Sequence, residues 1–218
     1  MTAQLTEHAL AWRADPYTEA LRSGRGPLYL RRSDGWLLPL EVERWCAAPD
    51  AADATVLERC RGRVLDIGCG PGRLVSTLAA RGHHALGVDI TPEAVARTVR
   101  AGGSALCRSV FEPLPCEGHW DTVLLIDGNV GIGGDPSVLL RRAARLASRH
   151  GSLLVEVAAT EVDERVEVHV DDGRGGRSAP FRWARLGTGA LCVTAAAAGW
   201  SRSLTWHAEG RRFVSLCR

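Results

Sequence analysis

The chain of 218 residues contains no lysine, so all 27 of its basic side chains are arginines. This absence excludes the phosphate-binding loop in which a lysine follows the last glycine. Together with the richness in alanine and glycine, it is typical of high-GC codon usage, and we infer no phosphate binding from it. The formal net charge is only +2, so no strong field favours nucleic acid or an acidic membrane as a partner.

The seven cysteines are odd in number and scattered, and no two of them form a C-x-x-C pair. We therefore expect no metal site and no disulfide framework, but free thiols in a reducing cytoplasm. The longest weakly polar run, residues 190–200, is about half of the ~20 residues that a membrane helix needs. Residues 1–10 contain no basic segment followed by an apolar one. We expect no signal peptide, no membrane partner and a cytoplasmic location.

From residue 62 onward, segments typical of strands alternate with segments typical of helices. This alternation predicts a doubly wound, Rossmann-like α/β fold with a mostly parallel sheet. The predicted strands are Val64–Ile67, Ala85–Asp89, Ala105–Cys107, 121–126 and 153–157, and the predicted helices are 73–81, 92–101 and 136–150. Thr91 is expected to cap the second of these helices, and Pro92 suits its first turn.

The C-terminal third predicts two hairpins. Strands at 164–170 and Phe181–Leu186 flank a glycine-rich turn, which gives a β-hairpin insertion over residues 160–186. After a helix near 188–199, strands at 203–207 and 212–217 form the second hairpin. Its last strand is expected to join the sheet edge antiparallel, as the seventh strand of a domain that spans residues 61–218.

Residues 1–60 are expected to form an N-terminal cap on that domain. Residues 5–21 suit one or two helices interrupted at Pro16, residues 28–40 suit a hairpin, and residues 54–60 suit a short helix. Five aromatic residues lie in this segment and are candidates to line an apolar acceptor pocket or simply to pack on the sheet. They are Trp12, Tyr17, Tyr29, Trp36 and Trp45.

The most informative stretch is Val-Leu-Asp-Ile-Gly-Cys-Gly-Pro-Gly at residues 64–72. Asp66 lies at the end of a strand, and glycines alternate at 68, 70 and 72 before a helix. This spacing differs from the G-x-G-x-x-G of dinucleotide sites, because position 73 is arginine. The glycines let a ligand approach the backbone, and the helix N-terminus offers N–H groups to an anion. The arrangement suits a ligand that carries both an amine and an acid.

A second carboxylate extends this hypothesis. Asp89 ends the next strand, 23 residues after Asp66, and such an acid accepts hydrogen bonds from both hydroxyls of a ribose. A nucleoside joined to an amino acid, without phosphates, would satisfy both carboxylates. These two motifs closely resemble those of class I S-adenosylmethionine-dependent methyltransferases, strongly over residues 62–157.

The resemblance implies roles for individual residues. Asp66 would order the methionine part of S-adenosylmethionine, and the backbone of Gly68, Cys69 and Gly70 would approach it, with Gly72 completing the motif. Asp89 would hold the ribose, and Ile90 would pack on the adenine. The acidic residue that the family often places on the adenine amino group would fall at Ser109 or Val110, so backbone groups there, or Glu112 in a shifted register, would replace it.

The carboxyl end of the fourth strand is where open α/β sheets bind ligands, and here residues 127–135 include four glycines. Asp127 is the first candidate for a polar group that faces the cofactor sulfur or the acceptor, and Asn129 is the second. These two are our candidate catalytic residues. Asp135 is expected to cap the following helix. The segment lacks the Asn/Asp-Pro-Pro-aromatic signature of nucleic-acid and glutamine N-methyltransferases, which argues against base methylation.

Histidines and one further carboxylate complete the set of polar residues considered. His83 and His84 are expected in a solvated loop and His119 in an exposed turn. His169, His207 and Glu156 are candidates to face the pocket.

The sequence therefore predicts a monomeric or homodimeric enzyme that transfers a methyl group from S-adenosylmethionine to a small molecule by in-line displacement, with no nucleic-acid partner. A methyltransferase of protein or RNA, and a non-catalytic protein that binds S-adenosylmethionine, stay open as alternatives.

Overall fold

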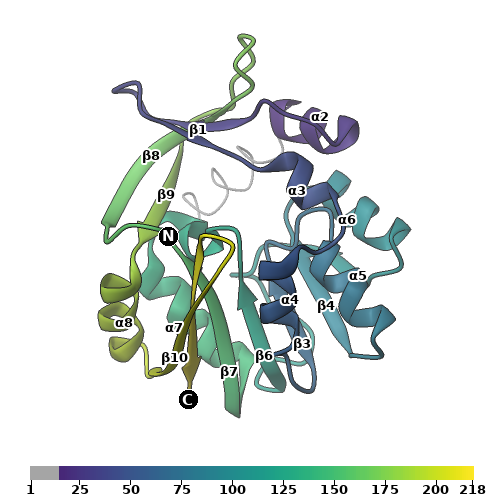
Figure 1. The fold of residues 1–218 in the computed structure, drawn as a ribbon, viewed down its shortest axis with the longest axis vertical. Helices are drawn as coiled ribbons and strands as arrows, with labels where there is room; N and C mark the ends of the chain where they lie inside the picture. The colour runs from purple at the N-terminus through teal and green to yellow at the C-terminus, as the bar shows by residue number, and fades with distance from the viewer. Residues whose placement is uncertain (1–14) are drawn as a thin grey trace.

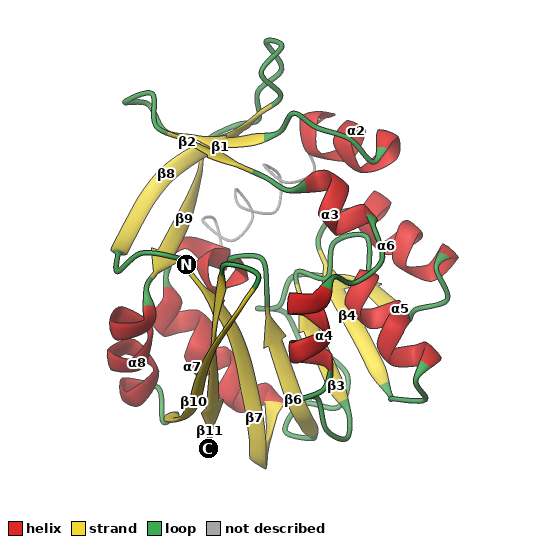
Figure 2. Cartoon of the chain, viewed as in Figure 1, coloured by secondary structure: helices red, strands yellow, loops and turns green. Residues whose placement is uncertain are grey.

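The computed structural model describes residues 15–218 and contains two sheets (Figures 1 and 2). The larger sheet has seven strands in the order β10-β11-β7-β6-β3-β4-β5. The adjacent strands β7, β6, β3, β4 and β5 are parallel to one another, whereas β11 is antiparallel to both β7 and β10. The predicted α/β fold, with its mostly parallel sheet and antiparallel C-terminal hairpin, is confirmed.

The strands of this sheet are β3 (Val64–Ile67), β4 (Ala85–Asp89), β5 (Ala105–Cys107), β6 (Trp120–Leu125), β7 (Ala147–Val157), β10 (Ser201–Ala208) and β11 (Arg211–Cys217). Helices cover both faces because side chains alternate along each strand. Leu65 and Ile67 belong to the core that includes helices α7 (Pro136–Leu146) and α8 (Thr188–Ala197). Val64 belongs to the core on the other side, with helices α4 (Ala51–Leu57) and α5 (Arg73–Ala80).

A smaller, four-stranded sheet joins two distant parts of the chain. Strands β1 (Tyr29–Arg31) and β2 (Leu37–Pro39) form the predicted N-terminal hairpin, and β8 (Asp163–Asp171) and β9 (Phe181–Leu186) form the predicted insertion. Strand β1 pairs antiparallel with β8, so the order is β2-β1-β8-β9. We call this sheet, together with helices α2 (Asp15–Ser23) and α3 (Val42–Cys46), the cap.

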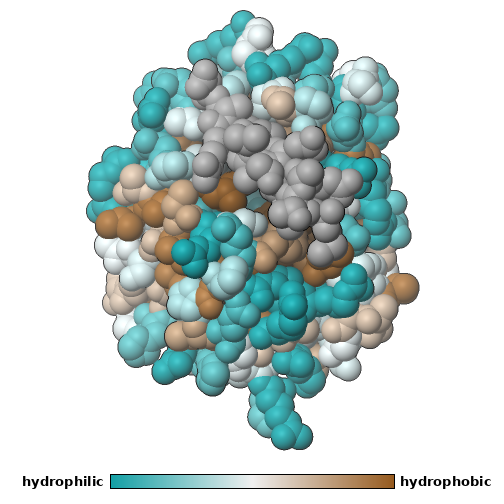
Figure 3. All heavy atoms as spheres, turned by 180° about the vertical axis from the view of Figure 1, so that it is seen from behind, coloured by the Kyte–Doolittle hydropathy of each residue, from teal (hydrophilic) through white to brown (hydrophobic). Residues whose placement is uncertain are grey.

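The cap lies over one end of the larger sheet, with α2 beside α6 (Pro92–Arg100) (Figure 1). A 3-10 segment, η1 (Asn129–Gly134), follows β6 and packs against β9. Seen from behind, hydrophilic residues cover both ends of the molecule and hydrophobic residues gather near its middle (Figure 3). All seven cysteines are free thiols.

Several local predictions were wrong. The helix predicted over 136–150 ends at Leu146, because residues 147–150 extend β7, where Ala147 pairs with Trp120. Pro16 lies in the first turn of α2, where proline is tolerated. Residues 5–14 and Trp12 lie outside the described residues, so the predicted interruption at Pro16 stays a prediction. Thr91 occupies the N-cap position of α6, yet its side chain forms no capping hydrogen bond. Helix α3 was not predicted.

The turn after β3 requires glycine at position 72. The φ of Gly72 is +86°, and a Cβ atom there would lie 2.3 Å from the Thr98 hydroxyl oxygen on α6. Gly82 has a similar φ of +82°, but a Cβ atom there would meet nothing within 4 Å. Gly72 therefore allows both the turn and the close packing of α5 on α6.

We expect Gly72→Ala to lower the free energy of unfolding by about 3 kcal/mol, from backbone strain together with overpacking against Thr98. Gly82→Ala is the matched control and should cost only about 1 kcal/mol, since it adds strain without a clash. Urea denaturation of both variants measures the difference. Equal losses would show that the contact with Thr98 does not constrain position 72.

Candidate active site

One cavity lies where loops at the carboxyl ends of the parallel strands meet the cap. Its volume, counted together with the part that is open to solvent, is about 850 Å³. The lining residues from the larger domain are Ile67, Gly68, Cys69, Gly70, Pro71, Arg73, Val88, Asp89, Ile90, Thr91, Arg108, Ser109, Val110, Asp127, Asn129 and Ile132. Tyr17, Leu40, Trp45 and Trp183 line it from the N-terminal segment and β9.

The glycine turn after β3 is shaped on one side by packing and on the other by the cavity. The amide of Asn129 donates hydrogen bonds of 2.9 Å to the carbonyl oxygens of both Ile67 and Gly68. A Cβ atom on Gly68 would lie 2.6 Å from that amide nitrogen. At Gly70, by contrast, a Cβ atom would meet only the Tyr17 hydroxyl, at 3.9 Å. Asn129 thus holds the turn in place, while Gly70 leaves the backbone open to a ligand.

Asp89 lies in the wall of the cavity as a buried carboxylate. It accepts hydrogen bonds from the backbone N–H groups of Gly70, at 3.0 Å, and Thr91, at 2.8 Å. Burial raises the pKa of this carboxyl, and the hydrogen bonds oppose the rise. The Thr91 side chain and the Ile90 backbone also form hydrogen bonds with this carboxyl.

Apolar and polar groups continue the wall beyond Asp89. Ile90, Ser109 and Val110 line it together, and Val110 is only 5% exposed. Glu112 is not in the wall, because its carboxylate accepts the backbone N–H of Ser109 at 2.9 Å and so stabilises the turn.

Two residues of the motif lie outside the cavity wall. Asp66 was expected to meet the ligand, but its position in β3 alternates with Ile67, which lines the cavity, so Asp66 belongs to the opposite face of the sheet. Asp66 is 3% exposed, and burial raises its pKa to about 7. Gly72 is absent from the wall because it packs against Thr98.

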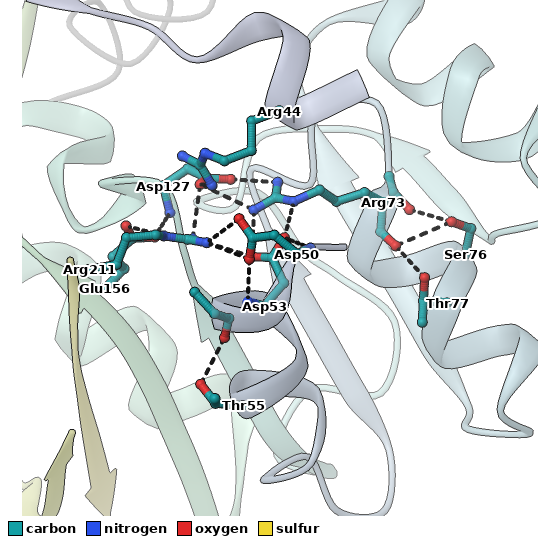
Figure 4. Close-up of polar contacts among 12 residues, drawn as sticks. Arg44, Asp50, Asp53, Thr55, Arg73, Ser76, Thr77, Asp127, Glu156 and Arg211 are labelled. Carbon is teal, nitrogen blue, oxygen red and sulfur yellow. Dashed lines mark hydrogen bonds and ion pairs between the residues drawn. The ribbon is translucent and has the colours of Figure 1, made fainter. Parts of the chain in front are cut away.

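Asp127 is held by three arginines (Figure 4). Arg73 donates to both of its carboxylate oxygens, at 2.7 and 3.2 Å, and Arg211 donates at 3.3 Å. An ion pair of 2.9 Å joins it to Arg44 on α3. Burial raises the pKa of the Asp127 carboxyl, but Arg73 and Arg44 outweigh it, so the pKa is lowered. We predicted a polar group that faces the reaction, whereas the structure shows a carboxylate already neutralised by the protein.

The same arginines bind further carboxylates. Arg73 forms two hydrogen bonds with Asp53, at 2.7 and 2.9 Å, and Arg211 binds Asp53 at 2.9 Å and Glu156 at 2.7 Å. Asp53 is fully buried, and although burial raises its pKa, the two arginines lower it to about 2. Glu156 also accepts the backbone N–H of Asp127 at 2.7 Å. We call these residues, with Asp50 and Arg44, the charge network.

Some of the remaining candidate residues line the cavity and others do not. Asp135 caps α7 as predicted, accepting the N–H groups of Ser137 and Val138. None of the described histidines lines the cavity, and Glu156 belongs to the charge network instead. Of the N-terminal aromatic residues, Tyr17 and Trp45 line the cavity, whereas Tyr29 and Trp36 do not. Trp183 was not predicted as a cavity residue. It lies two residues after the buried Phe181 on β9, and this spacing indicates that both side chains lie on the inward face of the strand.

Comparison with known proteins agrees with this geometry. A methyltransferase domain family matches residues 42–198. A SAM-dependent methyltransferase from Bacteroides fragilis, solved with S-adenosyl-L-homocysteine, has 18% identity and a TM-score of 0.75, over 99% of this chain and 96% of that chain. The 1,6-didemethyltoxoflavin-N1-methyltransferase of Burkholderia thailandensis has 18% identity and a TM-score of 0.58, over 77% of each chain. The sugar N-methyltransferase KedS8 from Streptoalloteichus has 18% identity and a TM-score of 0.57, over 76% and 84%.

The cavity, the glycine turn and the match over residues 42–198 define the class: the chain belongs to the methyltransferase domain family. The resemblance to class I S-adenosylmethionine-dependent methyltransferases, made from residues 64–89, is thereby confirmed at the level of family and fold. Within residues 15–218, no helix is long and apolar enough to cross a membrane. The same residues contain no cluster of His, Cys, Asp or Glu able to hold a metal ion.

Asp66 predicts an unusual dependence of stability on pH. Its pKa is raised to about 7 in the folded state, so between pH 4 and 7 the unfolded chain loses a proton that the folded chain keeps. Stability from this residue therefore falls as the pH rises, by roughly 1 kcal/mol per unit, and is lowest above pH 7. In denaturation experiments, the free energy of unfolding of Asp66→Asn should rise relative to that of the wild-type protein from pH 4 to pH 7. A difference independent of pH would contradict the raised pKa.

Asp127→Asn tests the charge network. Arg44 would lose its carboxylate, while Arg73 and Arg211 would keep theirs, so we expect a loss of about 2–3 kcal/mol, near the lower end for breaking a buried ion pair. Asp135→Asn is the matched control, since asparagine caps a helix about as well as aspartate. Equal stability of both variants in urea denaturation would show that Asp127 contributes no structural ion pair.

Proposed function

We propose that this methyltransferase uses S-adenosylmethionine to methylate a small-molecule acceptor. The observation that carries the proposal is that one cavity is lined both by the glycine turn with Asp89 and by aromatic side chains of the cap. A donor and an acceptor molecule could therefore meet at the same cavity. The methyltransferases from Burkholderia and Streptoalloteichus, which share the fold, are named for small acceptors, a didemethyltoxoflavin and a sugar.

The residues present suit S-adenosylmethionine. Asp89 would accept hydrogen bonds from the ribose hydroxyls, and the backbone at Gly68, Cys69 and Gly70 would lie along the methionine part. Ile90 and Val110 would pack on the adenine. The open space at the position of a Gly70 Cβ atom supports this assignment, because a side chain there would fill the cavity. When bound, S-adenosylmethionine supplies a methyl carbon that an acceptor atom attacks in line with the leaving sulfur.

The protein contributes position more than charge to this reaction. Asn129 fixes the glycine turn through two carbonyl oxygens, and the pKa of the Asp127 carboxyl is lowered by its arginines. Asp127 is therefore a weak base, and we assign Asp127 and Asn129 positioning roles in place of the catalytic roles suggested by the sequence. Alignment of two reactants in one cavity can by itself supply a large share of a rate enhancement.

Label transfer tests the proposal against its alternatives. The protein is incubated with methyl-labelled S-adenosylmethionine and, separately, with a metabolite extract, protein or RNA. We expect label in the small-molecule fraction. Transfer only into protein or RNA would overturn the small-molecule assignment, and absence of S-adenosylhomocysteine binding would overturn the cofactor assignment.

Asp89→Ala should weaken the binding of S-adenosylhomocysteine by about 1.5–3 kcal/mol, because a charged acceptor of two ribose hydrogen bonds is lost. This corresponds to a rise in Kd of roughly 10- to 150-fold, measured by calorimetry. Asp163→Ala is a suitable control, since Asp163 lies on β8 with its side chain 54% exposed and outside the cavity wall. Unchanged affinity in Asp89→Ala would remove the ribose assignment.

A further inference from the structure

Three aromatic side chains form one side of the cavity. Tyr17 comes from α2, Trp45 from α3 and Trp183 from β9, and all three line the space that the glycine turn also lines. The rings of Tyr17 and Trp45 meet edge to face, with centroids 6.4 Å apart. The Tyr17 hydroxyl lies 3.9 Å from the position that a Cβ atom on Gly70 would occupy, so these aromatic side chains lie next to the glycine turn.

The position of Trp183 depends on a glycine after β6. A Cβ atom on Gly131 would lie 2.5 Å from Cε2 and 2.7 Å from Nε1 of the Trp183 indole. Gly131 has no positive φ, so it is required for space and not for backbone conformation. The glycine-rich segment after β6 therefore makes room for the indole that forms part of the wall.

Trp45 brings a polar group that residues 15–218 leave unpaired. Its indole Nε1 is buried and has no hydrogen-bond partner in this described part of the chain. An unpaired buried donor is unfavourable, and because an indole N–H only donates, an oxygen or other acceptor atom on a ligand would remove the cost. The N–H can thus distinguish ligands that carry such an atom from those that do not.

Three of the charged groups of the wall have partners within the protein, whereas Arg108 donates only to the carbonyl oxygen of Pro113. Asp127 and Arg73 are paired with each other, and Asp89 accepts two backbone N–H groups. Flat ligands gain from stacking or edge contacts with aromatic rings, whereas a strongly charged ligand would find no unpaired partner in these three groups.

We propose that the acceptor is a flat aromatic or heteroaromatic molecule with an oxygen at its edge, which packs on Trp45 and Trp183 and accepts a hydrogen bond from the Trp45 indole N–H. This proposal rests on the proposed function, since it names the acceptor class of the same cavity. An acceptor of this class differs from an aminosugar.

Calorimetry on the protein saturated with S-adenosylhomocysteine tests it with three probes. Oxindole and indole are flat two-ring molecules that differ by one carbonyl oxygen, and glucosamine represents aminosugars. We expect oxindole to bind about tenfold more tightly than indole, as one hydrogen bond allows, and glucosamine not to bind. Equal affinities for oxindole and indole, or binding of glucosamine at least as tight as oxindole, would overturn the proposal.

Variants test the contribution of the Trp45 indole N–H and that of the aromatic rings separately. Trp45→Phe keeps an aromatic ring but removes the donor, so oxindole affinity should fall to that of indole while indole affinity stays unchanged. Trp183→Ala should weaken both. Trp36→Phe is the control, because Trp36 lies outside the cavity against Arg32 and Arg185 and should change neither affinity. A preserved preference for oxindole in Trp45→Phe would overturn the role of the N–H.

The two proposals fail differently. Each variant is first titrated with S-adenosylhomocysteine, which also reports correct folding. If the wild-type protein does not bind this molecule, the proposed function fails. If it binds normally and oxindole shows no preference over indole, only the acceptor class is wrong.

Discussion

Three guanidinium groups and four carboxylates, gathered in one place, connect the cap to the carboxyl edge of the sheet. They come from six separate parts of the chain: Arg44 on α3, Asp50 and Asp53 at the start of α4, Arg73 on α5, Asp127 after β6, Glu156 on β7 and Arg211 on β11 (Figure 4). Burying charges is costly unless each has a partner, and here the partners are supplied by different elements. The charge network therefore fixes how these elements sit around the cavity.

This network also accounts for the backbone at the end of β6. Asp127 has a φ of +58°, a conformation that costs energy in a residue with a side chain. Its N–H donates to Glu156 and its carboxylate is bound on several sides, so the surrounding contacts stabilise the strained turn. The next residues then lead into η1, where Asn129 reaches back to the glycine turn.

The sequence was most informative where function depends on local geometry. The spacing of Gly68 and Gly70 and the acid at Asp89 predicted a ligand turn, and these residues do line one cavity. The ion pairs of Asp127 were not predicted, because its partners Arg44 and Arg211 lie 83 and 84 residues away, a proximity that only the fold creates. Likewise, residues 147–150 continue a helical pattern, yet pairing with β6 overrides that local preference.

The cap hairpins were both predicted, but their pairing was not, since nothing local specifies it. Arg31 on β1 and Asp171 on β8 are 140 residues apart in the sequence and form an ion pair across the two strands. Closing so long a loop is entropically unfavourable until the core between the two strands is compact. During synthesis from the N-terminus, the chain thus completes the strands that flank its glycine turn well before β8 and β9 emerge. Trp183 is the last of the described lining residues to be synthesised, so a chain that stops before residue 181 would have the glycine turn without the side of the cavity that β9 forms.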